Sequence, residues 1–130
     1  MIYDIAIIGA GCAGLSLAYQ ILKNKKINKK IIIIDKKPEF KKDRTWSFWK
    51  IDEHDFEDCL EKQWFKFNIK LKNQLKLFEK SMYPYQTINS LKFYEKIKSE
   101  LNDNFELKLN SNIKTITKQN DIFEIKTENI

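Results

Sequence analysis

The sequence predicts an α/β fold, and three features near its start indicate it. An almost uncharged, β-branched run from Ile2 to Ile8 is typical of a strand buried on both faces of a parallel sheet. A glycine-rich turn follows, and apolar residues between Leu15 and Leu22 then recur at helical spacing. A second apolar run, Ile31 to Ile34, completes a strand–helix–strand unit.

The turn is a complete G-x-G-x-x-G motif made of Gly9, Ala10, Gly11, Cys12, Ala13 and Gly14. Gly9 allows a tight exit from the strand, Gly11 allows the backbone to approach a pyrophosphate, and Gly14 allows the helix to pack close to the strands. The start of the helix offers unpaired N–H groups to phosphate. The motif therefore predicts dinucleotide binding through these residues.

An acidic residue closes the unit at the position where a ribose would lie. Asp35 stands 21 residues after Gly14, and its carboxylate can accept hydrogen bonds from a ribose diol. The same charge would repel the 2′-phosphate of NADP. We therefore predict that Asp35 binds a cofactor other than NADP; the alternative is a βαβ unit without a ligand.

The composition indicates one small domain and argues against several partners. The chain has 130 residues, 42% of them hydrophobic, which suffices for one domain. Its net charge of +6 does not predict nucleic-acid binding, because the lysines are scattered and Arg44 is the single arginine. Cys12 and Cys59 form neither a disulfide framework nor a zinc pattern, so we expect a reduced, cytoplasmic compartment. We expect no targeting or membrane-spanning segment.

The connection from Lys36 to Lys50 is expected to be a polar loop, although it carries two tryptophans and Arg44. One interpretation is a hydrophobic flap that helps to cover the sheet. The other is that Arg44 reaches back to the phosphate or ribose of the cofactor, since a planar guanidinium binds phosphate oxygens bidentately. Both interpretations remain open at this point.

Residues 52–58 are acidic and contain His54, the one histidine of the chain. Histidine beside carboxylates can ligate a metal or act as a general base. A single histidine among solvated carboxylates is more often a surface residue, so we expect a short helix with an exposed acidic face and no metal site.

Residues 64–77 predict an antiparallel hairpin, because apolar and polar residues alternate on both sides of Lys72-Asn73. We expect one face of the hairpin to be buried in the core and the other to be exposed to solvent. The alternative is that its aromatic residues begin the wall of an apolar substrate cavity. The remaining elements are a turn at residues 81–85, a helix capped by Asn89 or Ser90, a third parallel strand at residues 105–109, and a hairpin of residues 113–117 and 122–126.

Three segments together resemble the lycopene cyclases that form β-ionone rings. The first runs from Asp4 to Ala18 and contains the glycine motif. The second, Asp-Arg-Thr-Trp-Ser-Phe-Trp from Asp43 to Trp49, is the specific part; Ser47 stands where the family often has cysteine. The third and weaker segment runs from Tyr83 to Phe93. The resemblance covers essentially the whole chain, which we expect to be an N-terminal fragment.

The resemblance implies a Rossmann-like FAD-binding βαβ fold of the glutathione-reductase/hydroxylase type, incomplete here and with an inserted antiparallel hairpin. Residues 1–130 would be the N-terminal part of a FAD-binding domain, and residues 61–85 the start of the substrate-domain sheet. The implied activity is that of a lycopene β-cyclase, a redox-neutral, proton-initiated cyclisation of linear carotenoid ends that needs bound reduced FAD. Lycopene or a related carotenoid would be the substrate, and the cytoplasmic enzyme would touch a membrane peripherally.

The catalytic acid is not expected in this chain, because nothing here matches the family's later acidic motif. The nearest group of carboxylates is Glu53, Asp55, Glu57 and Asp58, and we do not expect any of them to supply the proton. The fragment alone is therefore expected to be inactive.

Two other functions fit parts of the sequence. A FAD-dependent monooxygenase or isoprenoid reductase would share the glycine motif and Asp35, but not the Asp-Arg-Thr-Trp segment. A non-catalytic nucleotide-binding module would be consistent with the short chain.

Overall fold

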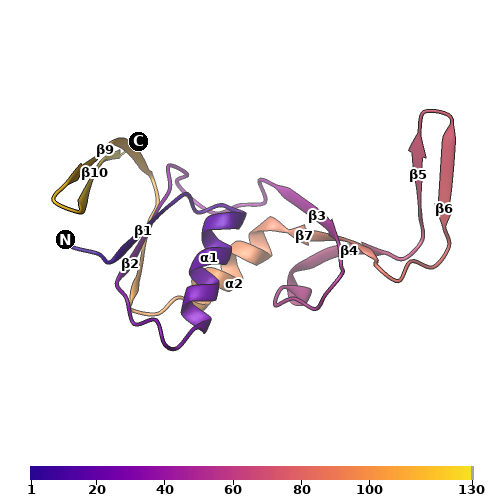
Figure 1. The fold of residues 1–130 in the computed structure, drawn as a ribbon, viewed down its shortest axis with the longest axis horizontal. Coiled ribbons are helices and arrows are strands. Elements are labelled where there is room, and N and C mark those ends of the chain that lie inside the picture. The colour runs from indigo at the N-terminus through magenta and orange to yellow at the C-terminus, as the bar shows by residue number, and fades with distance from the viewer. Residues whose placement is uncertain (130) are drawn as a thin grey trace. The chain divides into compact units, whose positions relative to one another are not determined.

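The computed structural model describes residues 1–129, which divide into two compact units (Figure 1). The first unit consists of residues 1–40 and 96–129, and the second of residues 41–95. Each unit has its own sheets and is described by itself.

A three-stranded parallel sheet forms the centre of the first unit. It has the order β1-β2-β8, with β1 at Ile5–Ile8, β2 at Ile31–Ile34 and β8 at Phe105–Lys108. The middle strand is four consecutive isoleucines, all buried, as expected where both faces of a parallel strand are covered. The predicted α/β fold and the third parallel strand are confirmed.

Helix α1, Cys12–Lys23, follows β1 and places Leu15, Ala18 and Tyr19 in the core. These positions recur at helical spacing, so one stripe of the helix is buried while Leu17 stays 52% exposed. The strand–helix–strand unit predicted from the sequence is therefore present.

The first unit ends in a hairpin of β9, Ser111–Gln119, and β10, Ile122–Asn129. Asn120 and Asp121 join the strands with φ of 48° and 62°, the left-handed conformation that two-residue hairpin turns require. This hairpin was predicted.

Helix α2, Ser90–Glu100, begins in the second unit and ends in the first. Asn89 caps it, because the Lys92 N–H donates to Asn89 Oδ1 at 3.1 Å. Of the two predicted caps, Asn89 is therefore the one observed. Phe93, Tyr94 and Ile97 lie on the buried side of this helix.

The second unit contains an antiparallel sheet of order β3-β7-β4, with β3 at Thr45–Trp49, β7 at Tyr85–Asn89 and β4 at Leu60–Trp64. The prediction that residues 36–50 form only a loop was wrong. Thr45–Trp49 alternates between exposed and half-buried side chains and pairs along its whole length with β7. That pairing joins segments 40 residues apart, which a local pattern does not reveal.

The acidic segment forms less helix than expected. A single 3₁₀ turn, η1 at Glu57–Cys59, replaces the predicted short helix, and Cys59 is buried. Two positions before it, Asp55 continues an irregular stretch. The exposed acidic helix is therefore corrected to a turn whose side chains point partly inward.

The hairpin predicted at residues 64–77 is present as β5, Phe67–Leu71, and β6, Gln74–Phe78. The face of this hairpin that we expected to be buried is exposed. Ile69, Leu71, Leu75 and Leu77 are 44–69% exposed, and among the described residues β5 and β6 pair only with each other. None of the helices in residues 1–129 is long and apolar enough to cross a bilayer.

Candidate dinucleotide-binding site

The glycine turn lies between the carboxyl end of β1 and the first turn of α1. Gly9 has a φ of +102°, and its N–H donates to the Ile34 carbonyl of the neighbouring strand at 2.8 Å. Only glycine adopts this φ without strain, so Gly9 permits the chain to leave β1 while staying tied to β2. The turn thus opens at the carboxyl ends of the parallel strands, where ligands of α/β sheets bind.

The N-terminus of α1 is not capped by a side chain. Gly11 is the N-cap residue in an extended conformation, and its carbonyl accepts the first helical hydrogen bond from the Leu15 N–H at 3.0 Å. The N–H groups of the first turn have no partner within the helix. Cys12 and Ala13, which carry two of these groups, are exposed. An anion could therefore bind here through the backbone N–H groups and the positive end of the helix dipole.

Gly14 brings α1 against the turn. A Cβ at this position would lie 1.9 Å from the Gly9 carbonyl oxygen and 3.2 Å from Ile7 Cγ2. At Gly9 and Gly11, in contrast, a Cβ would meet nothing within 4 Å. Gly14 thus allows close packing of helix and turn, whereas Gly11 borders open space.

Asp35 links the end of β2 to the glycine turn. Its Oδ2 accepts a hydrogen bond from the Ala10 N–H at 2.6 Å, and its Oδ1 accepts one from the Lys37 N–H at 2.8 Å. An ionised carboxylate has about four lone-pair sites, so each oxygen retains capacity for another donor. The structure therefore brings Asp35 together with the glycine motif.

These features fit the FAD that the resemblance to lycopene cyclases implies. The open space beside Gly11, the uncapped start of α1 and the remaining lone pairs of Asp35 match a pyrophosphate and a ribose. All seven predicted residues of the first unit, from Gly9 to Gly14 and Asp35, lie in this one region. Their role in binding remains a prediction.

Arg44 belongs to the second unit. Its Nη1 donates to the Asp43 carbonyl at 3.3 Å, and its backbone N–H donates to Ser90 Oγ at 3.3 Å. Arg44 is exposed. That its guanidinium binds the cofactor remains a prediction.

The segment around Arg44 has a packing role within its own unit. Trp46 packs edge-on against Phe93 at 5.1 Å and Tyr94 at 5.5 Å between ring centroids. The Tyr94 hydroxyl donates to Asp43 Oδ1 at 3.0 Å. Part of the Asp-Arg-Thr-Trp segment is therefore explained by its contacts with the start of α2.

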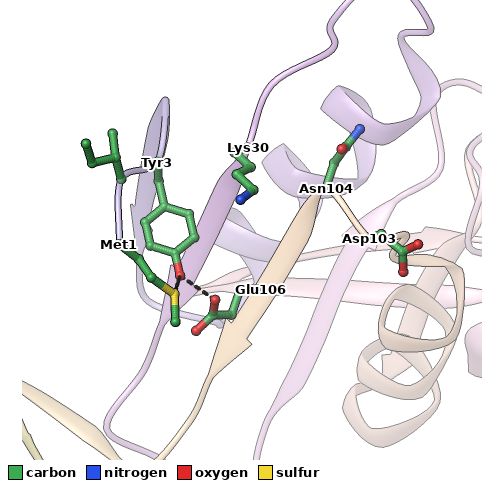
Figure 2. Close-up of a pocket in the computed structure, with 7 residues that line it drawn as sticks. Met1, Tyr3, Lys30, Asp103, Asn104 and Glu106 are labelled. Atoms are coloured by element: carbon green, nitrogen blue, oxygen red, sulfur yellow. Dashed lines mark hydrogen bonds between the residues drawn. The ribbon is translucent and has the colours of Figure 1, made fainter.

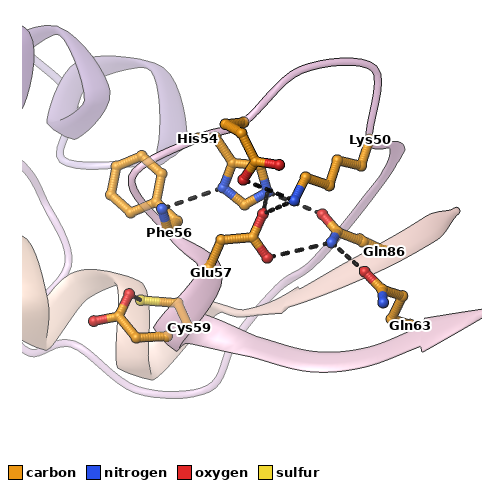
Figure 3. A network of polar contacts seen from close by, with 9 residues as sticks. Lys50, His54, Phe56, Glu57, Cys59, Gln63 and Gln86 are labelled. Atoms are coloured by element: carbon orange, nitrogen blue, oxygen red, sulfur yellow. Dashed lines mark hydrogen bonds and ion pairs between the residues drawn. The ribbon is translucent and has the colours of Figure 1, made fainter. Parts of the chain in front are cut away.

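A cluster of polar side chains in the second unit was missed by the sequence reasoning (Figure 3). Its centre is Gln86 on β7, which is fully buried. Gln86 Nε2 donates to Gln63 Oε1 and to Glu57 Oε2, the latter at 3.5 Å, and its Oε1 lies 2.9 Å from His54 Nε2. We call Lys50, His54, Glu57, Gln63 and Gln86 the polar cluster.

His54 is therefore not the surface residue that we expected. The Phe56 N–H donates to His54 Nδ1 at 3.2 Å, and because Gln86 Oε1 is an acceptor, His54 Nε2 must donate to it. These two bonds make Nε2 the donor and Nδ1 the acceptor of the ring. The side chain is only 20% exposed.

Glu57 holds the charged part of the polar cluster. Its Oε1 is buried and lies 2.6 Å from Lys50 Nζ and 3.4 Å from His54 Nε2. The ion pair with Lys50 is what compensates this buried oxygen. The Lys50 ammonium holds the pKa of Glu57 below its ordinary value, and Glu57, followed by Glu53, raises the pKa of Lys50. No group of three metal-ligating side chains occurs in residues 1–129.

A shallow hollow of about 70 Å³ lies at the other end of the parallel strands (Figure 2). The Tyr3 hydroxyl donates to Glu106 there, with Lys30 and Asp103 nearby, and this bond raises the pKa of Tyr3. The hollow is at the amino ends of the strands, opposite the edge where α/β sheets bind ligands, and its charges are mixed. It does not form part of the candidate site.

Comparisons with solved structures agree with this fold. A mutant of PqsL from P. aeruginosa has a similar structure, with a TM-score of 0.70, 10% sequence identity, and a match over 96% of this chain and 38% of that one. L-proline dehydrogenase from P. horikoshii has a TM-score of 0.53 and 20% identity over 98% of this chain and 19% of its own. At these identities the likeness concerns the fold alone, and this chain spans well under half the length of either protein. No curated protein matches the chain.

The family comparison is more specific. The model of the lycopene cyclase protein family matches residues 4–128, which is nearly the whole chain. It spans all three segments on which the resemblance in the sequence rested, including the glycine turn and the Asp-Arg-Thr-Trp segment. The predicted α/β fold, with its strand–helix–strand start and parallel sheet, is confirmed, and the chain belongs to the lycopene cyclase family.

Proposed function

We propose that this chain is the N-terminal, cofactor-binding portion of a lycopene β-cyclase that uses reduced FAD. The observation that carries the proposal is the uncapped start of α1 beside Gly11, joined through Ala10 to Asp35, in a chain of the lycopene cyclase family. Family membership supplies the class of enzyme. The site supplies the place for a dinucleotide.

The residues of the turn would bind the cofactor mainly through the main chain. N–H groups of Cys12 and Ala13 would donate to pyrophosphate oxygens, and Gly11 would leave room for them. Asp35 would accept hydrogen bonds from ribose hydroxyls while keeping its bond to Ala10. Arg44 would add a guanidinium to a phosphate or ribose. When bound, reduced FAD supplies an electron-rich surface that stabilises positive charge.

The reaction proposed for the complete enzyme is an isomerisation. A proton is added to the terminal double bond of a linear carotenoid, the neighbouring double bond closes a six-membered ring on the resulting tertiary cation, and a proton is lost. The reaction is redox-neutral, because the substrate and the product are isomers. Glu57 is a poor candidate for the acid, because its lowered pKa keeps it ionised at neutral pH.

The substrate sets where the enzyme works. A carotenoid such as lycopene dissolves in the bilayer, so the proposed enzyme is cytoplasmic and touches the membrane peripherally. The β3–β7–β4 sheet and the β5–β6 hairpin, which include residues 61–85, would begin its substrate domain.

Titration with FAD tests the cofactor site directly. We expect Gly11→Val to weaken FAD binding by about tenfold or more, since its side chain would fill the space beside the start of α1. Cys12→Ser is the matched control, because it changes an exposed side chain and keeps the same N–H groups. Equal FAD affinity in the Gly11→Val variant, with an unchanged circular dichroism spectrum, would remove the turn from the site.

Pigment analysis tests the chemistry. The complete reading frame that contains this chain is expressed in lycopene-accumulating bacteria, and a ringed product is expected. Unchanged lycopene together with substrate-dependent NADPH oxidation would indicate a monooxygenase or reductase. Unchanged lycopene with bound FAD and no turnover of any kind would indicate a nucleotide-binding module.

A further inference from the structure

The β5–β6 hairpin carries apolar side chains on both of its faces. Directly opposed residues of an antiparallel pair share a face. Ile69 opposes Lys76 and Leu71 opposes Gln74 on one face, whereas Leu75 opposes Lys70 and Leu77 opposes Asn68 on the other. The four apolar residues are 44%, 69%, 59% and 60% exposed, in the order Ile69, Leu71, Leu75 and Leu77. The hairpin thus has no polar face.

The same hairpin is strongly basic. Residues 66–80 contain five lysines and one acidic residue, Glu79. Glu79 pairs with Lys66 at 2.6 Å, near the base of the hairpin. Lys70 and Lys72, beside the turn, have no carboxylate partner among the described residues. The end of the hairpin that bears Leu71 and Leu75 therefore carries uncompensated positive charge.

We propose that the turn end of the β5–β6 hairpin is a membrane-docking element that inserts end-on into an anionic lipid surface. A layer of protein packed on the hairpin could cover one face and would leave the apolar residues of the other face in water. Lipid surrounds an inserted tip and covers both faces. Lys70 and Lys76 would then meet the acidic headgroups, which attract basic residues near the surface. Lys72 lies in the turn itself, and its long side chain would extend back to the headgroups.

The dimensions of the hairpin fit a shallow insertion. Ile69 stands two residues from Leu71, roughly 7 Å along the strand, which is within the roughly 5–10 Å to which interfacial elements bury their apolar side chains. Deeper insertion would place the unpaired backbone groups of both strands in hydrocarbon, where they are costly. In Figure 1 the two strands run as a separate ribbon pair beyond the end of the β3–β7–β4 sheet of the same unit.

The proposal concerns a surface remote in sequence from the glycine turn and does not rest on the cyclase reaction. Vesicle binding measures it without FAD or pigment, so a failure here and a failure of the proposed function are distinguishable.

Co-sedimentation with lipid vesicles tests the docking element. The 130-residue chain is mixed with vesicles of phosphatidylcholine alone and of phosphatidylcholine with phosphatidylglycerol. We expect the chain to bind the vesicles that contain phosphatidylglycerol, and we expect this binding to weaken as salt is added. Leu71→Asn combined with Leu75→Asn is expected to abolish binding. Lys70→Gln and Lys72→Gln are expected to weaken it about five-fold each.

The β9–β10 hairpin provides a matched control. Ile122→Asn combined with Phe123→Asn changes two apolar residues that are 70% and 63% exposed near a hairpin turn, but this turn also carries Asp121 and Glu124. This variant is expected to bind like the original chain. All these positions are exposed, so the substitutions remove little core packing.

Four results would overturn the proposal. They are no binding to anionic vesicles, equal binding to phosphatidylcholine alone, equal loss in the control variant, and a dimer in size-exclusion chromatography that the Leu71→Asn and Leu75→Asn variant converts to a monomer. The last result would assign the hairpin to contact with a second copy of the chain.

Discussion

The glycine turn of the first unit and the polar cluster of the second are built by opposite means. The turn is formed by main-chain groups and by the absence of side chains at Gly9, Gly11 and Gly14. The polar cluster is formed by side chains that come from a loop and two strands and meet at the buried amide of Gln86. The glycine turn depends on the absence of Cβ atoms, whereas the polar cluster depends on the presence of each of its side chains.

This difference predicts how each region fails. Adding one carbon at Gly14 introduces an overlap with the backbone, which cannot move aside. Removing the Gln86 side chain from the polar cluster leaves half-buried polar groups of Glu57 and His54 without a partner.

The largest effect is expected for Gly14→Ala. The new Cβ would lie 1.9 Å from the Gly9 carbonyl oxygen, and only separation of α1 from β1 would relieve the overlap. Overpacking costs roughly 1–3 kcal/mol and occasionally more, and contact with backbone places this site at about 3 kcal/mol or above. Urea denaturation followed by circular dichroism measures the change in the free energy of unfolding.

Gly11→Ala is the control for this prediction. Its Cβ meets nothing within 4 Å, and alanine at an N-cap is less favourable than glycine by under about 1 kcal/mol. A similar loss of stability in both variants would contradict the view that close approach, and not glycine as such, distinguishes Gly14.

The same contrast explains what could be predicted from the sequence. The strand, turn, helix and Asp35 follow one another within 35 residues, so their periodicity and spacing revealed the fold and the candidate site. Strand β3 and the polar cluster depend on pairing with β7, some 20 to 40 residues away, and no local pattern marks Gln86 as buried. The prediction that the β5–β6 hairpin has one buried apolar face was wrong for a related reason. The alternation within each strand was predicted correctly, but the pairing register places the apolar residues of the two strands on opposite faces.

The second largest effect is expected for Gln86→Leu. The leucine would fill similar volume, but Glu57 Oε2 and His54 Nε2, on half-buried side chains, would each lose a partner, whereas the exposed Gln63 could bond to water instead. Buried groups left unsatisfied cost about 1–3 kcal/mol, so a loss of about 2–3 kcal/mol is expected from urea denaturation.

An exposed ion pair in the same unit is the comparison. Lys66→Ala removes the 2.6 Å contact between Lys66 and Glu79. The side chains of these two residues are 69% and 70% exposed. Such surface pairs contribute between 0 and about 1 kcal/mol. Equal effects of Gln86→Leu and Lys66→Ala would show that the polar cluster contributes no more than a surface contact.

A smaller effect is expected for Asp35→Asn. Its two carboxylate oxygens accept from the Ala10 and Lys37 N–H groups, and an amide would set an NH₂ group against one of these donors. The free energy of unfolding should fall by about 1–2 kcal/mol, measured in urea without FAD. Unchanged stability would mean that the turn keeps its shape without the carboxylate, and Asp35 would then be available to a ribose alone.

The smallest effect concerns the acid side of the pH–stability curve. Because the Lys50 ammonium lowers the pKa of Glu57 in the folded chain, the ion pair stabilises the fold fully above the ordinary Glu57 pKa of 4.5. This contribution is lost as the pH falls through the lowered pKa of the folded state. The Glu57 side chain is 38% exposed, so solvent screening keeps the contribution below about 1 kcal/mol.

The difference between the original chain and Glu57→Gln isolates this contribution from that of other carboxylates. Asp4 also has a lowered pKa, mainly because it accepts a hydrogen bond from the Lys30 N–H, and it adds to the acid sensitivity of both proteins equally. Unfolding is measured in urea from pH 7 down to the acid limit of folding, and the variant is expected to show the shallower decline. Parallel curves would mean that Glu57 is held by the geometry of its neighbours and not by its charge. The polar cluster would then depend on its neutral hydrogen bonds, in contrast to the glycine turn, where the Asp35 carboxylate accepts from the main chain.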